Sequence, residues 1–126
     1  MNRAKKMKEI KLIDIQVLLA EARNSEHKES YRILGKTNDY RIGAGARIGR
    51  SDQPSFFLEV LIYLCPDHVS VDIPLLERKL KFLKELTKRG YSTSCQDSNC
   101  IACEITLAPR NLSAEHKAIK SMIKRI

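Results

Sequence analysis

The sequence predicts an α+β domain in which a mixed or antiparallel sheet carries packed helices. Three consecutive features indicate this class. Residues 56–64 form an apolar segment typical of a central strand. Residues 72–89 have the periodicity of an amphipathic helix, and residues 91–107 have the pattern of a β-hairpin. We expect helices at the N- and C-terminal ends of the chain to pack on the sheet that contains this strand–helix–hairpin core.

Size and composition indicate one domain spanning residues 1–126. A chain of this length, 43% hydrophobic and 30% charged, can bury a core without crosslinks. Its longest apolar run is far shorter than the roughly 20 residues that cross a bilayer. The basic N-terminal segment lacks the apolar stretch of a signal peptide, because Glu9, Lys11 and Asp14 interrupt it. We therefore expect a cytoplasmic protein without a membrane partner.

The charge distribution is strongly basic and uneven. The formal net charge is +8, from 23 Lys and Arg residues against 15 Asp and Glu residues. Residues 1–11 and residues 110–126 each contain five basic residues and one glutamate. Such basic ends favour a polyanionic partner, RNA or DNA, and solubility alone is the competing explanation.

The N-terminal segment, residues 1–25, is compatible with two structures. It contains many helix formers. Ile13, Ile15 and Val17, however, alternate with other residues as in a strand. We predict a helix and keep a strand over residues 10–18 as the alternative.

A near-repeat and a glycine-rich segment follow. Residues 31–35 resemble residues 40–43, and the turn-forming residues between them predict a β-hairpin. Residues 43–50 are rich in glycine, which lets a backbone approach a phosphate closely. The spacing does not match G-x-G-x-x-G, so we favour a glycine-bearing edge strand or turn. Three arginines around this segment are candidate nucleic-acid contacts: Arg41, Arg47 and Arg50.

The central strand and the helix after it have the clearest patterns. Residues 56–64 are apolar on both faces apart from Glu59, which places this strand near the middle of the sheet. Asp72 can cap the following helix, and Gly90 is a natural end for it. The expected apolar face of this helix consists of Leu75, Leu76, Leu80, Phe82, Leu83 and Leu86.

The last helix is expected to begin at Ser113, a residue type that caps helices well. Ile119, Met122, Ile123 and Ile126 form its apolar stripe. Its other side is basic and supplies four more candidate nucleic-acid contacts: Lys117, Lys120, Lys124 and Arg125.

All four cysteines fall in the hairpin or just past the end of the central strand, at Cys65, Cys95, Cys100 and Cys103. If the strands before and after the central helix are parallel neighbours, their carboxyl ends lie at one sheet edge. Within the hairpin, we expect a register that places Cys95 opposite Cys103. Thiols stay reduced inside cells, so metal or redox chemistry is favoured over disulfides.

The cysteine spacing is compatible with several kinds of site. Cys100 and Cys103 form a C-x2-C pair, and Cys65 and His68 form a C-x2-H pair. Together they suit a tetrahedral zinc site, with Cys95 as a further candidate ligand. The C-x4-C-x2-C spacing also suits an iron–sulfur cluster, but no later cysteine supplies the fourth ligand. A redox dithiol and simple packing of free thiols stay open as alternatives.

These features favour a small binding protein with zinc at one corner and nucleic acid on its basic surface. We call this corner, where Cys65, Cys95, Cys100 and Cys103 are expected to meet, the cysteine corner. The first alternative is a protein–protein interaction or assembly subunit with buried structural cysteines. The second is a thiol redox protein. An enzyme is not favoured, because only His68 among the three histidines falls near the corner and no paired carboxylates stand out.

Overall fold

A computed structural model describes residues 12–65, 71–97 and 99–126 of the chain. The helices and strands in these ranges follow one another in the order α1 (Leu12–Asn24), β1 (Glu29–Lys36), β2 (Tyr40–Ile48), a short 3₁₀ turn (Arg50–Asp52), β3 (Pro54–Tyr63), α2 (Ile73–Lys88), β4 (Ser92–Asp97), β5 (Cys100–Leu107) and α3 (Pro109–Ile123).

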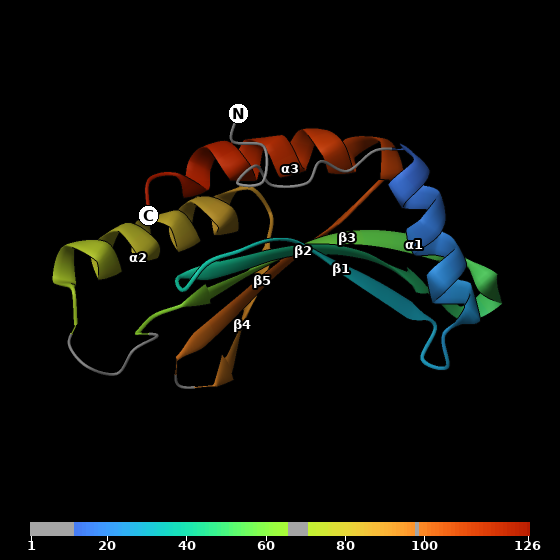
Figure 1. The fold of residues 1–126 in the computed structure, drawn as a ribbon, viewed down its shortest axis with the longest axis horizontal. Coiled ribbons are helices and arrows are strands. Elements are labelled where there is room, and N and C mark those ends of the chain that lie inside the picture. The colour runs from blue at the N-terminus through green and yellow to red at the C-terminus, as the bar shows by residue number, and fades with distance from the viewer. Residues whose placement is uncertain (1–11, 66–70, 98) are drawn as a thin grey trace, which may run out of the picture.

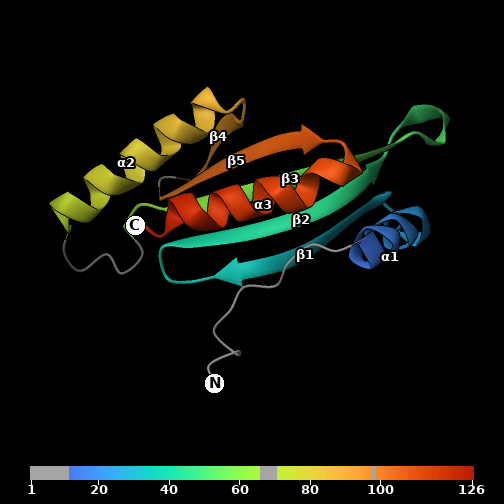
Figure 2. The ribbon, with the colours of Figure 1, turned by 90° about the horizontal axis from the view of Figure 1, so that it is seen from above.

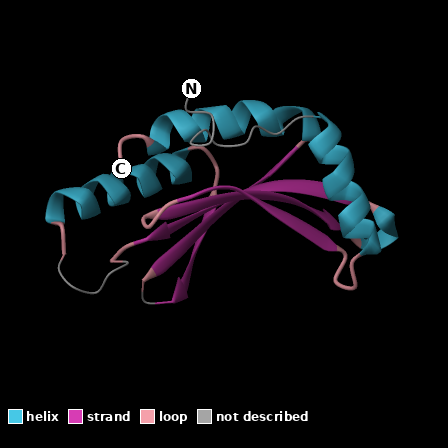
Figure 3. Cartoon of the chain, in the orientation of Figure 1, coloured by secondary structure: helices cyan, strands magenta, loops and turns pink. Residues whose placement is uncertain are grey.

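The five strands form one sheet with the order β1-β2-β3-β5-β4, and every neighbouring pair is antiparallel. The helices arc over one side of the curved sheet, with α3 above its centre, α1 over β1 and β2, and α2 toward the β4 side (Figures 1 and 2). Figure 3 shows the same two layers by secondary structure. We call the covered side the helical face and the opposite side the outer face. The predicted α+β class, with terminal helices packed on the sheet, is confirmed.

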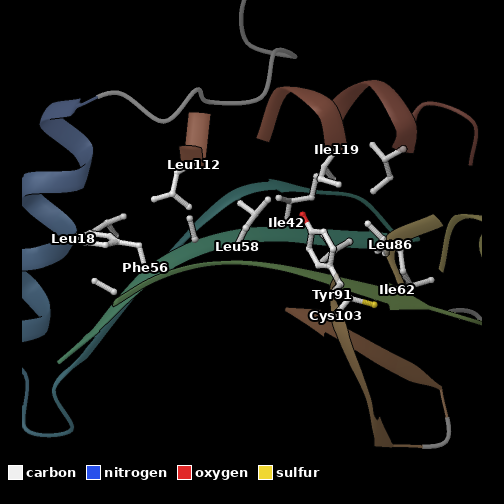
Figure 4. Packing of buried hydrophobic residues seen from close by; sticks show 14 of the residues in the cluster. Leu18, Ile42, Phe56, Leu58, Ile62, Leu86, Tyr91, Cys103, Leu112 and Ile119 are labelled. Carbon is white, nitrogen blue, oxygen red and sulfur yellow. The ribbon is translucent and has the colours of Figure 1, made fainter. Parts of the chain in front are cut away.

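β3 is the central strand, as its sequence predicts, and it is buried on both faces. On the outer face, Phe57 and Leu61 are only 2% and 7% exposed. On the helical face, β3 contributes to the main core, which all three helices cover. Members of this core include Leu18, Ile42, Phe56, Leu58, Ile62, Leu86, Leu112 and Ile119 (Figure 4).

The helix prediction for the N-terminal segment is correct for the part that the structure describes, whereas residues 1–11 lie outside it. Ile15, Leu18 and Ala22 recur at helical spacing and pack into the main core. The hydroxyl of Ser30, at the start of β1, donates a hydrogen bond to the carbonyl of Leu18 at 2.6 Å. This bond fixes α1 against the sheet.

The predicted β1–β2 hairpin is confirmed, but the glycine-rich segment is neither an edge strand nor a turn. Most of it lies in β2, which is paired on both sides, with β1 and β3. A Cβ at Gly43 would meet the ring of Tyr31, and a Cβ at Gly45 would meet the ring of Phe57 and the carbonyl of Ser30. The two rings are stacked across the outer face, with centroids 6.4 Å apart. The glycines of β2 therefore make room for aromatic packing.

α2 begins and ends as predicted. Asp72 is its N-cap and accepts a hydrogen bond from the N–H of Leu75 at 3.0 Å, and the chain leaves the helix through Gly90 with a φ of 100°. The expected apolar face is only partly correct, because Leu80 is 45% exposed while Lys79 is fully buried. Periodicity alone assigns a lysine to the solvent, so it could not predict this burial.

The predicted start of α3 is wrong. The helix begins at Pro109, with Ala108 as its N-cap, and Ser113 lies inside it. Proline suits the first turn of a helix, where its missing N–H has no partner to lose. Starting earlier, α3 also buries Leu112 and His116, which the expected apolar stripe did not include.

The expected register of the second hairpin is also wrong. The turn is one residue shorter than expected, so that Asp97 pairs with Cys100, and an irregularity between Cys95 and Asp97 then places Cys95 opposite Ile101. Thr93, and not Cys95, lies opposite Cys103. A shift of one residue changes every later pairing, and the residue types in this hairpin do not indicate where such a shift occurs.

We expect Gly45→Ala to destabilise the fold by roughly 1–3 kcal/mol, the usual cost of overpacking, because the new methyl group meets a backbone oxygen. Gly49→Ala is the matched control, since the nearest neighbour of a Cβ there lies at 3.5 Å. That change should stay within about 0.5 kcal/mol. Urea unfolding followed by circular dichroism measures both, and equal effects would contradict the packing explanation.

Candidate functional site

The structure places three of the four cysteines at one end of the sheet. Cys65 follows β3, Cys95 lies near the end of β4, and Cys100 begins β5. β3 and β4 run parallel to each other, but they are not neighbours, because β5 lies between them. The side chain of Asn99 joins the corner, since it accepts a hydrogen bond from the N–H of Cys65 and donates one to its carbonyl, at 2.6 and 2.9 Å.

The C-x2-C pair is divided between the two faces of β5. Cys103 is fully buried in the main core, close to Tyr91 (Figure 4). Cys100 belongs to a small apolar cluster on the outer face with Leu61 and Ala102. Residues three apart in a strand point to opposite faces, so this spacing does not set two ligands side by side.

Of the expected metal ligands, His68 lies outside the described residues. Among the residues that the structure does describe, no group of three or more Cys, His, Asp or Glu side chains is placed to hold a metal ion. Zinc or an iron–sulfur cluster at this corner therefore stays a prediction from the sequence.

The four thiols differ in burial, which affects how readily each can react. Desolvation raises the pKa of the Cys103 thiol to about 12, with a smaller contribution from the charge of Cys100. Desolvation also raises the pKa of Cys100, helped by the nearby carboxylate of Asp97. Cys95 is exposed and Cys65 is half-buried. The thiolate is the reactive form, so accessible Cys95 is the thiol best placed to react.

Arg47 lies on the outer face, where its charge is already matched. Its guanidinium lies 4.0 Å from the centre of the Phe57 ring. It forms two hydrogen bonds to Glu104, at 2.6 and 2.7 Å, and also pairs with Glu29. These carboxylates raise the pKa of Arg47 despite its partial burial.

Arg41 shares the outer face. Its guanidinium lies 5.5 Å from the centre of the Tyr31 ring and 4.0 Å from a carboxylate oxygen of Glu59. Burial and then the charge of Glu59 raise the pKa of Tyr31 to about 12. Arg50 is exposed in the turn after β2. Of the three candidate contacts Arg41, Arg47 and Arg50, only Arg50 therefore has no carboxylate partner among the described residues.

The remaining candidates lie on the opposite side of the sheet, along α3. Lys117 and Lys124 are exposed, and Lys120 is half-buried. Arg125 forms an ion pair with Glu85 of α2 at 3.1 Å. Because the two groups of candidates lie on opposite sides of the sheet, they do not form one continuous surface.

α2 carries further exposed cations that the candidate set did not include. Arg78 and Lys81 lie beside α3, where a groove of about 140 Å³ separates the two helices. Its lining consists of Arg78, Lys81, Phe82, Glu85, Met122 and Arg125. The helical periodicity did place these cations on the solvent side of α2, but only the packing of α2 beside α3 shows that they border a groove.

The buried Lys79 fastens α2 to the end of the sheet. Its Nζ donates to the carbonyl of Tyr63 at 2.6 Å and lies 2.9 Å from a carboxylate oxygen of Asp39. A longer contact of 3.4 Å reaches the carbonyl of Leu64. These oxygens accept the hydrogen bonds of the ammonium group, which water would otherwise accept and which would be costly to leave unmade in a buried position.

Glu115 fastens α3 to the segment that joins α2 to β4. It accepts two hydrogen bonds from Arg89, at 2.7 and 3.1 Å, and one from the hydroxyl of Tyr91 at 2.8 Å. The bonds from Arg89 lower the pKa of Glu115, although burial opposes them. Burial and the neighbouring carboxylate raise the pKa of Tyr91.

Comparison with known proteins assigns no family to this fold and these surfaces. No protein-family model, curated protein or solved structure matches the chain. No helix in the described part of the chain is long and apolar enough to cross a membrane. Inference about function therefore depends on the geometry and charge of the surfaces themselves.

We expect the four thiols to react with iodoacetamide in the order of their exposure. Cys95 should be labelled first and Cys65 next, while Cys100 and Cys103 stay protected until the protein unfolds. Timed labelling followed by peptide mass spectrometry measures the order. Rapid labelling of Cys103 in the native protein would contradict its place in the core.

We expect Glu115→Gln to destabilise the protein by about 1–2 kcal/mol at neutral pH, because the charge-assisted bonds weaken. The folded-state pKa of Glu115 is lowered, so its contribution is complete above the ordinary pKa of glutamate and is lost as the pH falls through the lowered value. The difference between wild type and variant should therefore shrink in acid. Urea unfolding at several pH values measures it.

Glu26→Gln provides the control, because Glu26 is exposed and has no ion-pair partner among the described residues. Its stability should follow the wild type at every pH. A Glu115→Gln effect that stays constant from neutral to acidic pH would show that Glu115 does not act through its charge.

Proposed function

We propose that the chain binds nucleic acid through α2 and α3, with basic side chains contacting the phosphate backbone. The observation that carries this proposal is the surplus of unpaired positive charge on the exposed sides of these two helices, which lie near each other over the sheet (Figures 1 and 2). Six exposed cations on or next to them have no ion-pair partner among the described residues: Arg78, Lys81, Lys84, Lys88, Lys117 and Lys124.

The two sides of the sheet differ in how their cations are matched. On the outer face, Arg41 and Arg47 are opposed by Glu29, Glu59 and Glu104. A polyanion would have to break these pairs to bind there. On the helical side, unmatched lysines and arginines could neutralise phosphates directly and release the cations condensed on the nucleic acid, which is a major source of its affinity for basic proteins.

The groove between α2 and α3 favours a phosphate chain with adjoining apolar groups. Arg78 and Lys81 supply charge along it, while Phe82 and Met122 offer apolar contact. The ion pair between Arg125 and Glu85 connects the two helices at this groove. Contacts of this kind recognise the backbone, so we expect little preference for base sequence.

We expect the protein to bind labelled duplex DNA or single-stranded RNA with an affinity that falls steeply with salt. The double variant Arg78→Ala/Lys81→Ala should reduce the log–log salt slope by about 2, since each phosphate contact contributes about one unit. Fluorescence anisotropy at several salt concentrations measures both quantities.

The matched control removes two exposed cations that do not line the groove between α2 and α3. Arg23 lies in the last turn of α1 and Lys36 ends β1, so Arg23→Ala/Lys36→Ala makes the same change in net charge. The salt slope of this control should stay close to that of the wild type. No binding at low salt, or equal losses in the two double variants, would contradict the proposal.

A further inference from the structure

α2 carries an apolar stripe that the rest of the chain leaves largely uncovered. Ile73, Leu76 and Leu80 follow one another at intervals of three and four residues, so they lie along one side of the helix. Ile73 is 57% exposed and Leu80 is 45% exposed. Leu83 borders this stripe but is only 8% exposed, and with Lys79, Phe82 and Leu86 it belongs to the side of α2 that packs into the protein.

A groove continues from this stripe to the edge of the sheet. It has a volume of about 260 Å³ and lies between α2 and the helical face of β4 and β5. Its lining consists of Leu80, Leu83, Lys84 and Thr87 from α2, Thr93 from β4 and Ile101 from β5. The helical face of β4 is therefore covered less completely than the centre of the sheet. Figure 2 shows α2 and β4 together on the side of the molecule away from α1.

β4 is also an edge strand, and all six of its residues are exposed. Its sequence contains no proline and no lysine, the residue types that commonly protect an edge from pairing with another strand. The other edge strand, β1, carries the basic residues Arg32 and Lys36. An irregularity occurs in both edge strands, after Ile33 in β1 and after Cys95 in β4, so the basic residues are what distinguishes β1. β4 is thus the edge that is better suited to accept a further strand.

The charges beside the stripe favour one particular occupant. Glu77 and Lys84 lie on the same flank of α2, seven residues apart and nearly symmetric about Leu80. If a second copy of α2 lay antiparallel along the stripe, Glu77 of each copy would meet Lys84 of the other. Both residues are exposed and have no ion-pair partner among the described residues. The flank is therefore complementary in charge to itself.

We infer that two copies of this chain associate about a two-fold axis through β4 and α2. The β4 strands pair antiparallel, which extends the sheet across the axis. The two α2 helices pack antiparallel on the same face, and each inserts Leu80 toward the groove of its neighbour. A two-fold axis uses the same surface of both copies, as this self-complementary flank requires.

The dimer surface and the nucleic-acid surface share Lys84 but otherwise occupy different sides of α2. With 100° per residue, Arg78 and Lys81 lie roughly 100° or more around the helix from the centre of the apolar stripe. Association through the stripe would leave these cations exposed, so the dimer does not depend on nucleic-acid binding. It would place two basic surfaces in one particle.

The direct experiment is sedimentation equilibrium of the full chain over a range of concentrations. We expect a species of twice the 14.4 kDa chain mass. Leu80→Glu should weaken association by at least about a hundredfold, because two apolar side chains per dimer lose their burial. Ile33→Glu is the matched control, since Ile33 is 47% exposed on the other edge strand, and it should leave the dimer intact.

A charge exchange tests the helix pairing. Glu77→Lys and Lys84→Glu should each weaken the dimer, and the double variant should restore it, because the exchanged charges meet again across the axis. A short bismaleimide crosslinker should join two wild-type chains through exposed Cys95, and Cys95→Ser should abolish this product.

Two results would overturn the inference. One is a wild-type chain that stays monomeric at every concentration. The other is a dimer that Leu80→Glu and the single charge variants leave unchanged. Circular dichroism of each variant shows whether it is folded, and a Leu80→Ser variant replaces Leu80→Glu if the glutamate disturbs the helix.

Discussion

The buried ammonium group of Lys79 determines where α2 lies. It holds together three segments that are distant in sequence: the middle of α2, the carbonyl of Tyr63 at the end of β3, and Asp39 in the β1–β2 turn. A buried charge is tolerated only when it is paired and hydrogen-bonded, so the three segments must meet in this arrangement. Both surfaces that we propose for the protein include α2, and its position depends on this contact.

The sequence was sufficient for features in which several local signals agree. The burial of β3 followed from its apolar residues on both faces, and the bounds of α2 followed from Asp72 and Gly90. It was insufficient where a tertiary contact reverses the usual behaviour of a residue type. Lys79 is a lysine in the core, and the glycines of β2 serve aromatic rings that come from other strands.

The candidate site shows the same limit. The expected topology, with the strands before and after α2 as parallel neighbours, would gather all four cysteines at one sheet edge. These strands are parallel but not neighbours, and of the cysteines only Cys65, Cys95 and Cys100 lie at that end. The alternation of β5 already placed Cys103 on the face opposite Cys100, yet the spacing of the pair favoured a shared ligand role. The basic surface was visible as charge, but composition cannot show which cations are already matched by carboxylates. That distinction separates Arg47 on the outer face from Lys81 on α2.

The place of β5 between β3 and β4 has a consequence for how the chain acquires its structure during synthesis. β3 can pair with β2 as soon as both have left the ribosome, but its second neighbour is the last strand to be made. Until β5 is available, the most apolar strand of the protein is an unprotected edge of a three-stranded intermediate. Such an intermediate is prone to aggregation, so the nascent chain depends on rapid completion of its C-terminal third.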